Sequence, residues 1–455
     1  MKRDAINLNN DNVYSLFSKY FFPTLLGMLG MSAVTAIDGI FVGHSVGSDG
    51  VAAINIIAPV MMFITGIGLM IGVGCSVASS IHLSKNNLKA ARLNVTQAMI
   101  FITITAIVII AAMLASPDKT ATTLGSSEYL LPLVKEYMLW NVPSWIFMMW
   151  EAVALFIIRL DGSPKIAMSC NLITAALNVA LDWLFIFPFG WGLMGAAFAT
   201  SISTAAGSII AIVYLTCFAK KLHFIRLKAS IKSLKLSIRN IGYQCRTGSS
   251  AFLGEMTMAV LMFMGNQVFM HYLGDNGVGA FGIVCYYTPF IFMVGNAIAQ
   301  SAQPIISYNF GSGEKGRTIK TEKIALFTAF VCGIITTSLF SLFPQFMVGL
   351  FVDSGSDAAQ IAIYGFPFFA IGFVAFIFNL TAIGYFQSVE RIKPATFFAL
   401  LRGIILLIPS FIIMPHLLGI KGIWLAMPAT EIATSVIIIC FYYHTRLKER
   451  YRLAD

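Results

Sequence analysis

Long apolar runs follow one another from end to end of the chain, separated by short polar breaks. A helix needs about 20 apolar residues to cross a hydrocarbon core of about 30 Å, and each run is long enough for one such crossing. The pattern predicts twelve spanning helices, which start near residues 19, 51, 93, 130, 166, 192, 243, 278, 319, 357, 394 and 419. We therefore expect an all-α polytopic membrane protein.

The composition excludes a soluble protein. Of the 455 residues, 58% are hydrophobic and only 11% are charged, whereas about a quarter of the residues in a soluble domain are charged. The first 18 residues have no apolar core and no small-residue cleavage site, so we expect a short cytosolic lead and not a secretory signal. The seven cysteines stand singly, without a CxxC pair, and are interpreted as small core residues.

Lysine and arginine are distributed unevenly between the breaks. With twelve spans, every second break lies on the cytosolic side, and these breaks hold nearly all the basic residues. The presumed outer loops hold only Lys119 and Lys421, with Lys135 at the outer end of the fourth span. By the positive-inside rule both termini are predicted to be cytosolic. Basic loops that face an anionic leaflet explain the net charge of +10, so no nucleic-acid partner is expected.

The sequence repeats itself at an offset of about 227 residues. Residues 46–59 lie over 273–286, and residues 192–200 lie over 419–427. Six helices in each half make both halves enter the membrane from the same side, which predicts two six-helix bundles related by a pseudo-two-fold axis along the membrane normal. The expected parts are an N-terminal lobe (1–217), a basic interfacial connector helix (218–242) and a C-terminal lobe (243–455). This is a secondary-transporter architecture.

Four oxygen-bearing side chains are expected inside the bilayer at one depth in the N-terminal half. Asp38 and Asp182 fall in the outer half of their spans, counted at about 1.5 Å per residue from the nearest basic loop. Asn178 precedes Asp182 by four residues and shares its helix face, and Thr200 enters from the outer side. A buried charge is costly and needs a task or a partner, so the cluster indicates cation coupling. Helix association through hydrogen bonds is the alternative.

The C-terminal half lacks this cluster but contains three other ionisable groups, Glu255, Arg402 and Glu431, which are candidates for the substrate cavity or for gating. Ile405 and Pro409 fall near the positions that match Asn178 and Asp182. Arg402 is expected to form a buried ion pair with Glu431 or Glu255, and the remaining acid would be free for an ion or a drug. For Glu151, two roles stay open: its side chain reaches the inner rim or faces a cavity.

Two further residues of the N-terminal half are candidates for gating or for the cavity. Pro23 lies either in the first turn of its helix, where proline is tolerated, or deeper, where it would permit bending with Gly27. Tyr137 opens the fourth span at the outer interface, where an aromatic belt alone would place it.

Motifs for enzyme chemistry are missing from the sequence. It contains no GxxxxGK[ST] phosphate loop, so ATP is not expected as a partner. The six histidines have no zinc spacing, and no paired acidic motif or nucleophile constellation occurs. We expect a protein that is not an enzyme and has no cofactor.

Several motifs together resemble the multidrug and toxic compound extrusion (MATE) family over essentially the whole chain. They are FFPTLLG with Pro23, AIDGIFVGHSVGSDGVAAI (36–54), LNVALDWLFIF (177–187), GLMGAAFAT with Thr200, and QPIISYNFGSGEKGR (303–317). The set Asp38, Asn178, Asp182 and Thr200 is similar to the N-lobe cation site of the DinF-like prokaryotic branch. Pro23 and Tyr137 match positions linked there to bending of the first helix and to the cavity. Glu255 is similar to the C-lobe acid of the NorM-like branch, but Asn379 stands where that branch has a second carboxylate.

The resemblance implies a secondary antiporter that exports organic cations or other amphipathic drugs in exchange for H⁺ or Na⁺. Either ion suits the N-terminal cluster, because burial favours a protonated carboxyl and hard cations favour carboxylate, amide and hydroxyl oxygens. The expected protein is a monomer in the cytoplasmic (inner) membrane. A lipid-linked oligosaccharide flippase of the same superfamily is the alternative, although Arg402 is the only basic residue expected well inside a span.

Overall fold

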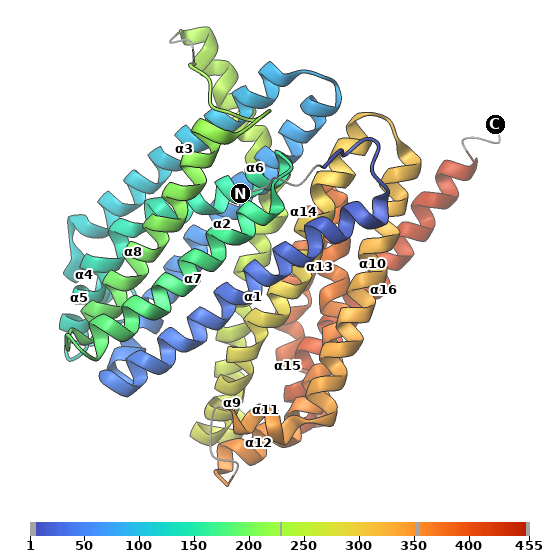
Figure 1. The fold of residues 1–455 in the computed structure, drawn as a ribbon. Coiled ribbons are helices and arrows are strands. Elements are labelled where there is room, and N and C mark those ends of the chain that lie inside the picture. Colours follow the sequence, from blue (N-terminus) through green and yellow to red (C-terminus); the bar gives the residue numbers. More distant parts are fainter. Residues whose placement is uncertain (1–5, 228–229, 351–354, 452–455) are drawn as a thin grey trace. The chain divides into compact units, whose positions relative to one another are not determined.

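The structure, a computed structural model, describes residues 6–227, 230–350 and 355–451. Within these ranges helices account for all the regular secondary structure (Figure 1). In the N-terminal half they are α1 (Val13–Ser45), α2 (Ser48–Ser84), α3 (Leu88–Ala115), α4 (Pro117–Thr123), α5 (Leu131–Asn141), the 3₁₀ turn η1 (Val142–Ser144), α6 (Trp145–Leu160), α7 (Pro164–Ile186), α8 (Gly192–Val213) and the π-helical turn η2 (Tyr214–Phe218).

The C-terminal half continues the same pattern. Its helices are α9 (Ile231–Gly311), α10 (Lys315–Leu342), α11 (Pro344–Gly349), α12 (Asp357–Ala370), α13 (Gly372–Ser388), α14 (Ile392–Leu400), the π-helical turn η3 (Leu401–Ile405), α15 (Leu407–Leu418) and α16 (Ile420–Tyr451). The long α9 is interrupted at Gly274, where the backbone leaves the helical region.

The helices confirm the predicted polytopic membrane fold. Eleven helical segments of the described chain are long and apolar enough to cross a membrane, and the bent pair α12 and α13, at 48° to each other, supplies a twelfth span. The span α5–η1–α6 contains Pro143, which removes a backbone donor and is accommodated in the short 3₁₀ turn. The predicted cytosolic location of the termini rests in part on residues 1–5 and 452–455, which lie outside the described residues.

The connector differs from the predicted interfacial helix. Residues 219–227 are not helical, because the Asp161 carboxylate accepts hydrogen bonds from the backbone N–H groups of Lys220, Lys221 and Leu222 at 3.1, 2.9 and 3.1 Å. A helix begins only at Ile231, where the Ser230 hydroxyl caps the first turn, and it runs directly into the seventh span. The second half of the predicted connector is therefore the start of a spanning helix.

The internal repeat recurs in the backbone conformation of matching turns. Gly47 and Gly274, which the repeat places over each other, have φ/ψ of 80°/−161° and 65°/−156°. Gly192 and Gly419 likewise both have positive φ, at 53° and 59°. Side chains rarely adopt such angles, so glycine is needed at each turn. The two halves of the sequence build corresponding turns in the same way.

By its contacts the chain divides into two compact units. Unit 1 comprises Met1–Glu255, Gln300–Thr321 and Ser388–Glu390, and unit 2 comprises Met256–Ala299, Glu322–Gln387 and Arg391–Asp455. Segments of the second half join unit 1 through polar contacts: Gln303 accepts a hydrogen bond from Ser76 at 2.8 Å and Gln300 accepts one from Arg159 at 2.7 Å. This division is not the predicted one at residues 217 and 243, and the two sequence lobes stay a prediction.

Candidate functional site

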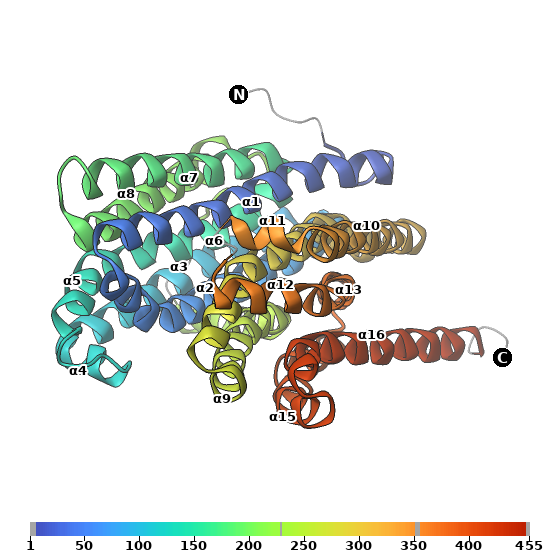
Figure 2. The same cartoon turned by 90° about the horizontal axis from the view of Figure 1, so that it is seen from below.

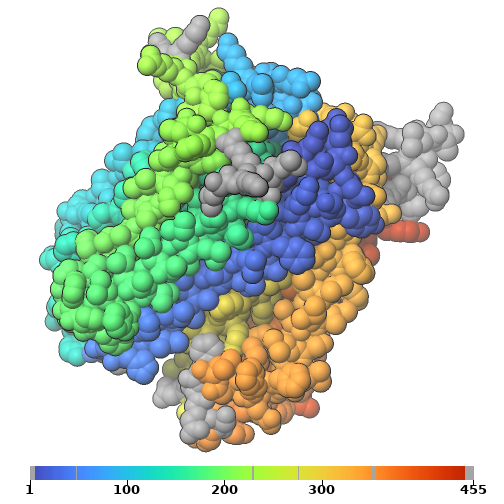
Figure 3. Space-filling view, in the orientation of Figure 1, coloured from blue at the N-terminus to red at the C-terminus, as the bar shows by residue number. Residues whose placement is uncertain are grey.

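Helix α7 lies at the centre of the predicted cation cluster in unit 1. It packs against α1 and α8, and α8 also packs against α5. Figures 1 and 2 show α1 beside α7 in both views, and in Figure 3 the side chains of α1 and α7 fill the space between these helices on the visible face. Asp38 lies on α1, and Asn178 and Asp182 lie on α7. Thr200 lies on α8 and Tyr137 on α5.

The two aspartates are the least satisfied groups of the cluster. Asp182 is 0% exposed, and both its carboxylate oxygens are buried without a hydrogen-bond partner in the described chain. Asp38 is half-buried, and its Oδ1 likewise has no partner among the described residues. The two carboxyl groups lie close enough for the charge on one to act on the other. Both negative charges therefore fall in one buried region.

The neutral members of the cluster lie beside these acids. The amide of Asn178 donates a hydrogen bond to Oγ1 of Thr200 at 3.3 Å, which links α7 to α8. Tyr137 is buried in α5, not spread on an outer interface, and it lies within electrostatic range of both Asp38 and Asp182. All five side chains thus come together in one region of unit 1.

This arrangement is suited to a monovalent cation. Two carboxylates buried together repel each other and lack solvation, so a proton or a metal ion would stabilise them. Carboxylate, amide and hydroxyl oxygens are hard ligands of the kind that Na⁺ accepts. Within the described residues no group of three or more His, Cys, Asp or Glu side chains could hold a metal ion.

Pro23 lies in the interior of α1 and not in its first turn. The helix begins at Val13 because Asn12 caps it and accepts a hydrogen bond from the backbone N–H of Tyr14 at 3.0 Å. A proline in this position removes one helical hydrogen bond and is a natural point for bending. One turn later, a β-carbon at Gly27 would lie 3.1 Å from the Asn171 amide, so α1 approaches α7 closely there.

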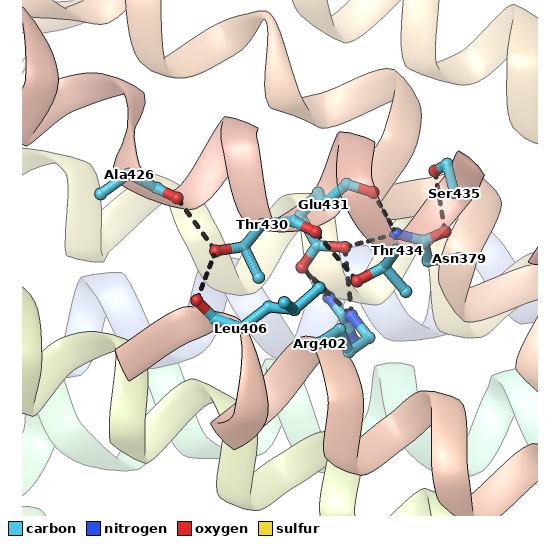
Figure 4. A network of polar contacts seen from close by, with 8 residues as sticks. All are labelled: Asn379, Arg402, Leu406, Ala426, Thr430, Glu431, Thr434 and Ser435. Carbon is cyan, nitrogen blue, oxygen red and sulfur yellow. Dashed lines mark hydrogen bonds and ion pairs between the residues drawn. The ribbon is translucent and has the colours of Figure 1, made fainter. Parts of the chain in front are cut away.

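In unit 2 the structure pairs Arg402 with Glu431, one of the two acids that the sequence left open. The shortest contact joins Nη2 of Arg402 to Oε1 of Glu431 at 2.7 Å, and Arg402 Nε donates to both carboxylate oxygens. Asn379 donates to Oε2 of the same carboxylate at 2.7 Å and accepts from Ser435 at 2.8 Å (Figure 4). The Phe376 ring lies under the guanidinium, with its centroid 4.5 Å from Cζ of Arg402.

These contacts satisfy most of the polar atoms of the pair. Arg402 and Glu431 are each only 1% exposed. The network joins α13, η3 and α16, and the Thr430 hydroxyl adds a contact to the Leu406 carbonyl at 3.4 Å, next to the π-helical turn (Figure 4). The Arg402–Glu431 pair and its hydrogen bonds therefore hold three helical segments together. The part in the cavity or in gating that the sequence suggested for this pair stays a prediction.

Glu255 is the acid left over from this pairing. It is 7% exposed, and it forms no ion pair and no hydrogen bond within the described residues. Its β-carbon lies 3.5 Å from the place that a β-carbon on Gly66 of α2 would occupy. Its suggested role as a second ion or drug site stays a prediction.

Two polar residues of α6, Arg159 and Glu151, are buried and form hydrogen bonds to distant parts of the chain. Arg159 is 2% exposed: besides its bond to Gln300, its backbone carbonyl accepts from the Tyr20 hydroxyl at 3.0 Å. Glu151 is 7% exposed, and it accepts a hydrogen bond from Thr174 of α7 at 3.1 Å. Thr174 could have been found from its spacing to Asn178 and Asp182, whereas the bond from Arg159 to Gln300 joins residues too distant in sequence for any local pattern.

Comparison with known proteins identifies this fold. The family model described as MatE matches residues 23–184 and 251–413, one stretch in each half of the chain. "Multidrug export protein MepA" of Staphylococcus aureus (strain NCTC 8325 / PS 47) is 26% identical over 449 residues, which cover 96% of this chain and 95% of that protein.

Solved structures of similar proteins have the same fold. A structure described as the "outward-facing conformation of a multidrug resistance MATE family transporter of the MOP superfamily" has a TM-score of 0.90 at 21% identity and covers 99% of this chain and 100% of that one. A MOP superfamily transporter from Pyrococcus furiosus Vc1 (DSM3638), whose binding pocket is described as of reverse polarity, has a TM-score of 0.88 at 20% identity, with coverage of 98% and 99%.

Proposed function

Because the chain belongs to the MATE family, we propose that it is a secondary active multidrug exporter that moves cationic or amphipathic organic compounds out of the cell in exchange for H⁺ or Na⁺. Members of this family are multi-pass membrane transporters, and the protein is not an enzyme. The similarity to multidrug export proteins over 96% of the chain supports drugs as substrates and does not favour the flippase considered from the sequence.

The observation that carries the proposed coupling is the pair of neighbouring acids, the buried Asp182 and the half-buried Asp38. Asp182 has no hydrogen-bond partner in the described chain, and the charge of Asp38 acts on it. Two such groups bind a cation when both are ionised. Their affinity for it falls when the protein changes to the state in which the site opens to the opposite side of the membrane. Asp38, Asn178, Asp182 and Thr200 would supply the oxygens in either case, for a proton or for Na⁺.

The energy of one ion is enough for useful export. One charge moving down about 100 mV releases about 2.3 kcal/mol, which sustains roughly a 50-fold concentration gradient of a neutral substrate. In our proposal, binding or release of the ion changes the packing of α1 against α7 and shifts the protein between two states. Pro23 and Gly27 in α1 are the residues that would allow such a change. We further propose that residues 1–217 and 243–455 act as the two lobes, in a cytoplasmic membrane with both termini in the cytosol.

The proposal is tested by efflux of ethidium from proteoliposomes, driven separately by an imposed pH gradient and an imposed Na⁺ gradient. We expect one gradient to drive efflux in the wild type and not in the variants Asp38→Asn or Asp182→Asn, because an amide keeps the size of the side chain but cannot exchange a cation. Ser169→Ala, at a half-buried position of α7 whose hydroxyl donates only to the Lys165 carbonyl of the same helix at 2.9 Å, is the control and should behave as the wild type. Normal ion-driven efflux in Asp38→Asn would contradict the proposed coupling site.

A further inference from the structure

Helix α7 carries a continuous polar face that extends well beyond the cation cluster. Asn171, Thr174, Asn178 and Asp182 recur at intervals of three and four residues, so they lie on one side of the helix. All four are buried, with exposures of 7%, 2%, 4% and 0%. Thr174 lies about 12 Å from Asp182 along the helix axis, toward the end that carries the basic loops. Such a buried polar face is expensive in an apolar bundle and indicates a function.

Glu151 meets this polar face at Thr174. Its Oε1 accepts the Thr174 hydroxyl hydrogen bond at 3.1 Å, so the acid of α6 contacts the helix that carries Asp182. Helix α8 closes the other side: a β-carbon at Gly207 would lie 1.9 Å from Thr174 Oγ1 and 2.8 Å from Glu151 Oε1. Only glycine lets α8 pass this close. Glu151 is thus enclosed by α6, α7 and α8, the last two of which also supply Asp182 and Thr200.

The neighbourhood of Glu151 provides no cation among the described residues. Its carboxyl group accepts the hydrogen bond from Thr174 and forms no ion pair within the described residues. The titratable group that faces it is the thiol of Cys170, one turn before Thr174. On its own helix, Arg159 lies two turns away and bonds to Gln300 instead.

Glu151 and Glu431 differ in how their charge is compensated. Both glutamates are buried, but Glu431 is paired with Arg402 at 2.7 Å and also accepts a hydrogen bond from Asn379, whereas the partner of Glu151 among the described residues is the Thr174 hydroxyl alone. A structural acid in an apolar bundle needs a permanent counter-charge. A buried acid without a permanent counter-charge is suited to bind a cation reversibly.

We propose that Glu151, with Thr174, is a second site for the coupling cation, which the ion occupies on its way between the Asp38–Asp182 site and the cytosolic side. This rests on the proposed function. As the ion moves, one carboxylate is freed and the other neutralised, so the total charge of the two sites stays constant; a proton would cross the about 12 Å carried by water, its O–H bond breaking at one carboxyl and forming at the next. Glu151 then returns the cation to cytosolic water.

The test separates coupling from drug handling in the same proteoliposomes. Glu151→Gln keeps an oxygen that can accept the Thr174 hydrogen bond but cannot exchange a cation. We expect ion-driven ethidium efflux to fall by about tenfold or more, while ethidium–ethidium exchange, measured without any ion gradient, is retained. Glu151→Asp should restore part of the ion-driven efflux.

Two matched variants examine the surroundings of Glu151. Gly207→Ala places a methyl group against Thr174 and Glu151 and should impair ion-driven efflux in the same way. Gly282→Ala, at a helical glycine whose β-carbon would meet no atom within 4 Å, is its control and should be neutral. Thr174→Val, which keeps the shape of the side chain but removes the hydroxyl, should lie between Glu151→Gln and the wild type.

The outcomes distinguish this inference from the proposed function. If Glu151→Gln keeps wild-type coupling, or if a folded Glu151→Gln protein loses efflux and exchange in parallel, Glu151 is a structural residue and the inference is overturned. If coupling is then lost in Asp38→Asn alone, the proposed function stays intact. Absence of ion-driven efflux in the wild type would overturn both.

Discussion

At the scale of single residues, the buried acids of the chain differ in how their charge is compensated. Glu431 has a guanidinium and an amide around it, whereas Asp182 has no hydrogen-bond partner in the described chain. Breaking a buried pair by removing one partner leaves an uncompensated charge, and this costs about 3–5 kcal/mol. The same physical rule therefore predicts opposite consequences for the two acids: loss of stability at Glu431 and loss of coupling at Asp182.

The buried Arg402–Glu431 pair of unit 2 is expected to stabilise the fold. Arg402→Met should lower the unfolding temperature of the detergent-solubilised protein markedly, because Glu431 would stay buried without its cation. The double variant Arg402→Met/Glu431→Leu should recover much of the loss, since neither charge remains. Lys135→Ala removes an exposed pair with Asp118, whose contact is 2.9 Å, and should change stability by less than about 1 kcal/mol. An Arg402→Met protein as stable as the wild type would rule out a structural role for the pair.

Much of the N-terminal site was accessible from the sequence because its members obey simple geometry. Asn178 and Asp182 are four residues apart on one helix, and counting from basic loops brought Asp38 and Thr200 to a similar depth. The choice between Glu431 and Glu255 as partner of Arg402 was not accessible, since both lie far from it in sequence. It depends on how α13, η3 and α16 pack.

At the scale of elements, close contact between helices depends on particular glycines. Gly365 of α12 faces the buried Trp424 of α16, and a β-carbon on it would lie 1.9 Å from the indole ring. The two helices pack together within unit 2. Any side chain at this position must displace either the indole or the helix.

We therefore predict that Gly365→Ala destabilises the protein. Overpacking of this kind costs about 1–3 kcal/mol, which exceeds the gain of about 1 kcal/mol from the higher helix propensity of alanine. Thermal unfolding followed by tryptophan fluorescence is the measurement, with Gly282→Ala as the control in which only the propensity term acts. Equal unfolding temperatures for the two variants would mean that α12 and α16 are not in close contact.

The spans themselves were predictable, but their interruptions were not. Apolar length alone located the twelve crossings, and ten of the predicted starts fall within a few residues of the observed ones. The first span begins earlier because Asn12 caps it, and the seventh begins earlier because Ser230 caps α9. The bend of 48° between α12 and α13 has no counterpart in average hydropathy, because it reflects local backbone geometry.

At the scale of the whole molecule, the MatE model matches one stretch in each half of the chain, as the internal repeat predicts. Corresponding turns have corresponding backbone angles, as Gly47 and Gly274 illustrate. An even number of spans in each half would give both halves the same orientation, and the distribution of the basic loops predicts which side is cytosolic.

The predicted topology can be measured with reporter fusions. Green fluorescent protein fused to the C-terminus should fluoresce, and alkaline phosphatase fused after residue 126, in the loop between α4 and α5, should be active outside. Alkaline phosphatase fused after residue 227, ahead of α9, should be inactive because the basic residues around this segment predict that it faces the cytosol. Activity of the last fusion would reverse the predicted orientation.

The matched turn glycines have a consequence for chirality. Gly47 and Gly274 combine positive φ with ψ near −160°, and a β-carbon on either would meet no atom within 4 Å. Only handedness, and not crowding, excludes an L residue there. Inverted, these angles are those of the ordinary extended polyproline II region. D-alanine introduced by semisynthesis should therefore adopt these backbone angles without strain and, by restricting the unfolded chain, leave the protein more stable than L-alanine does at the same positions.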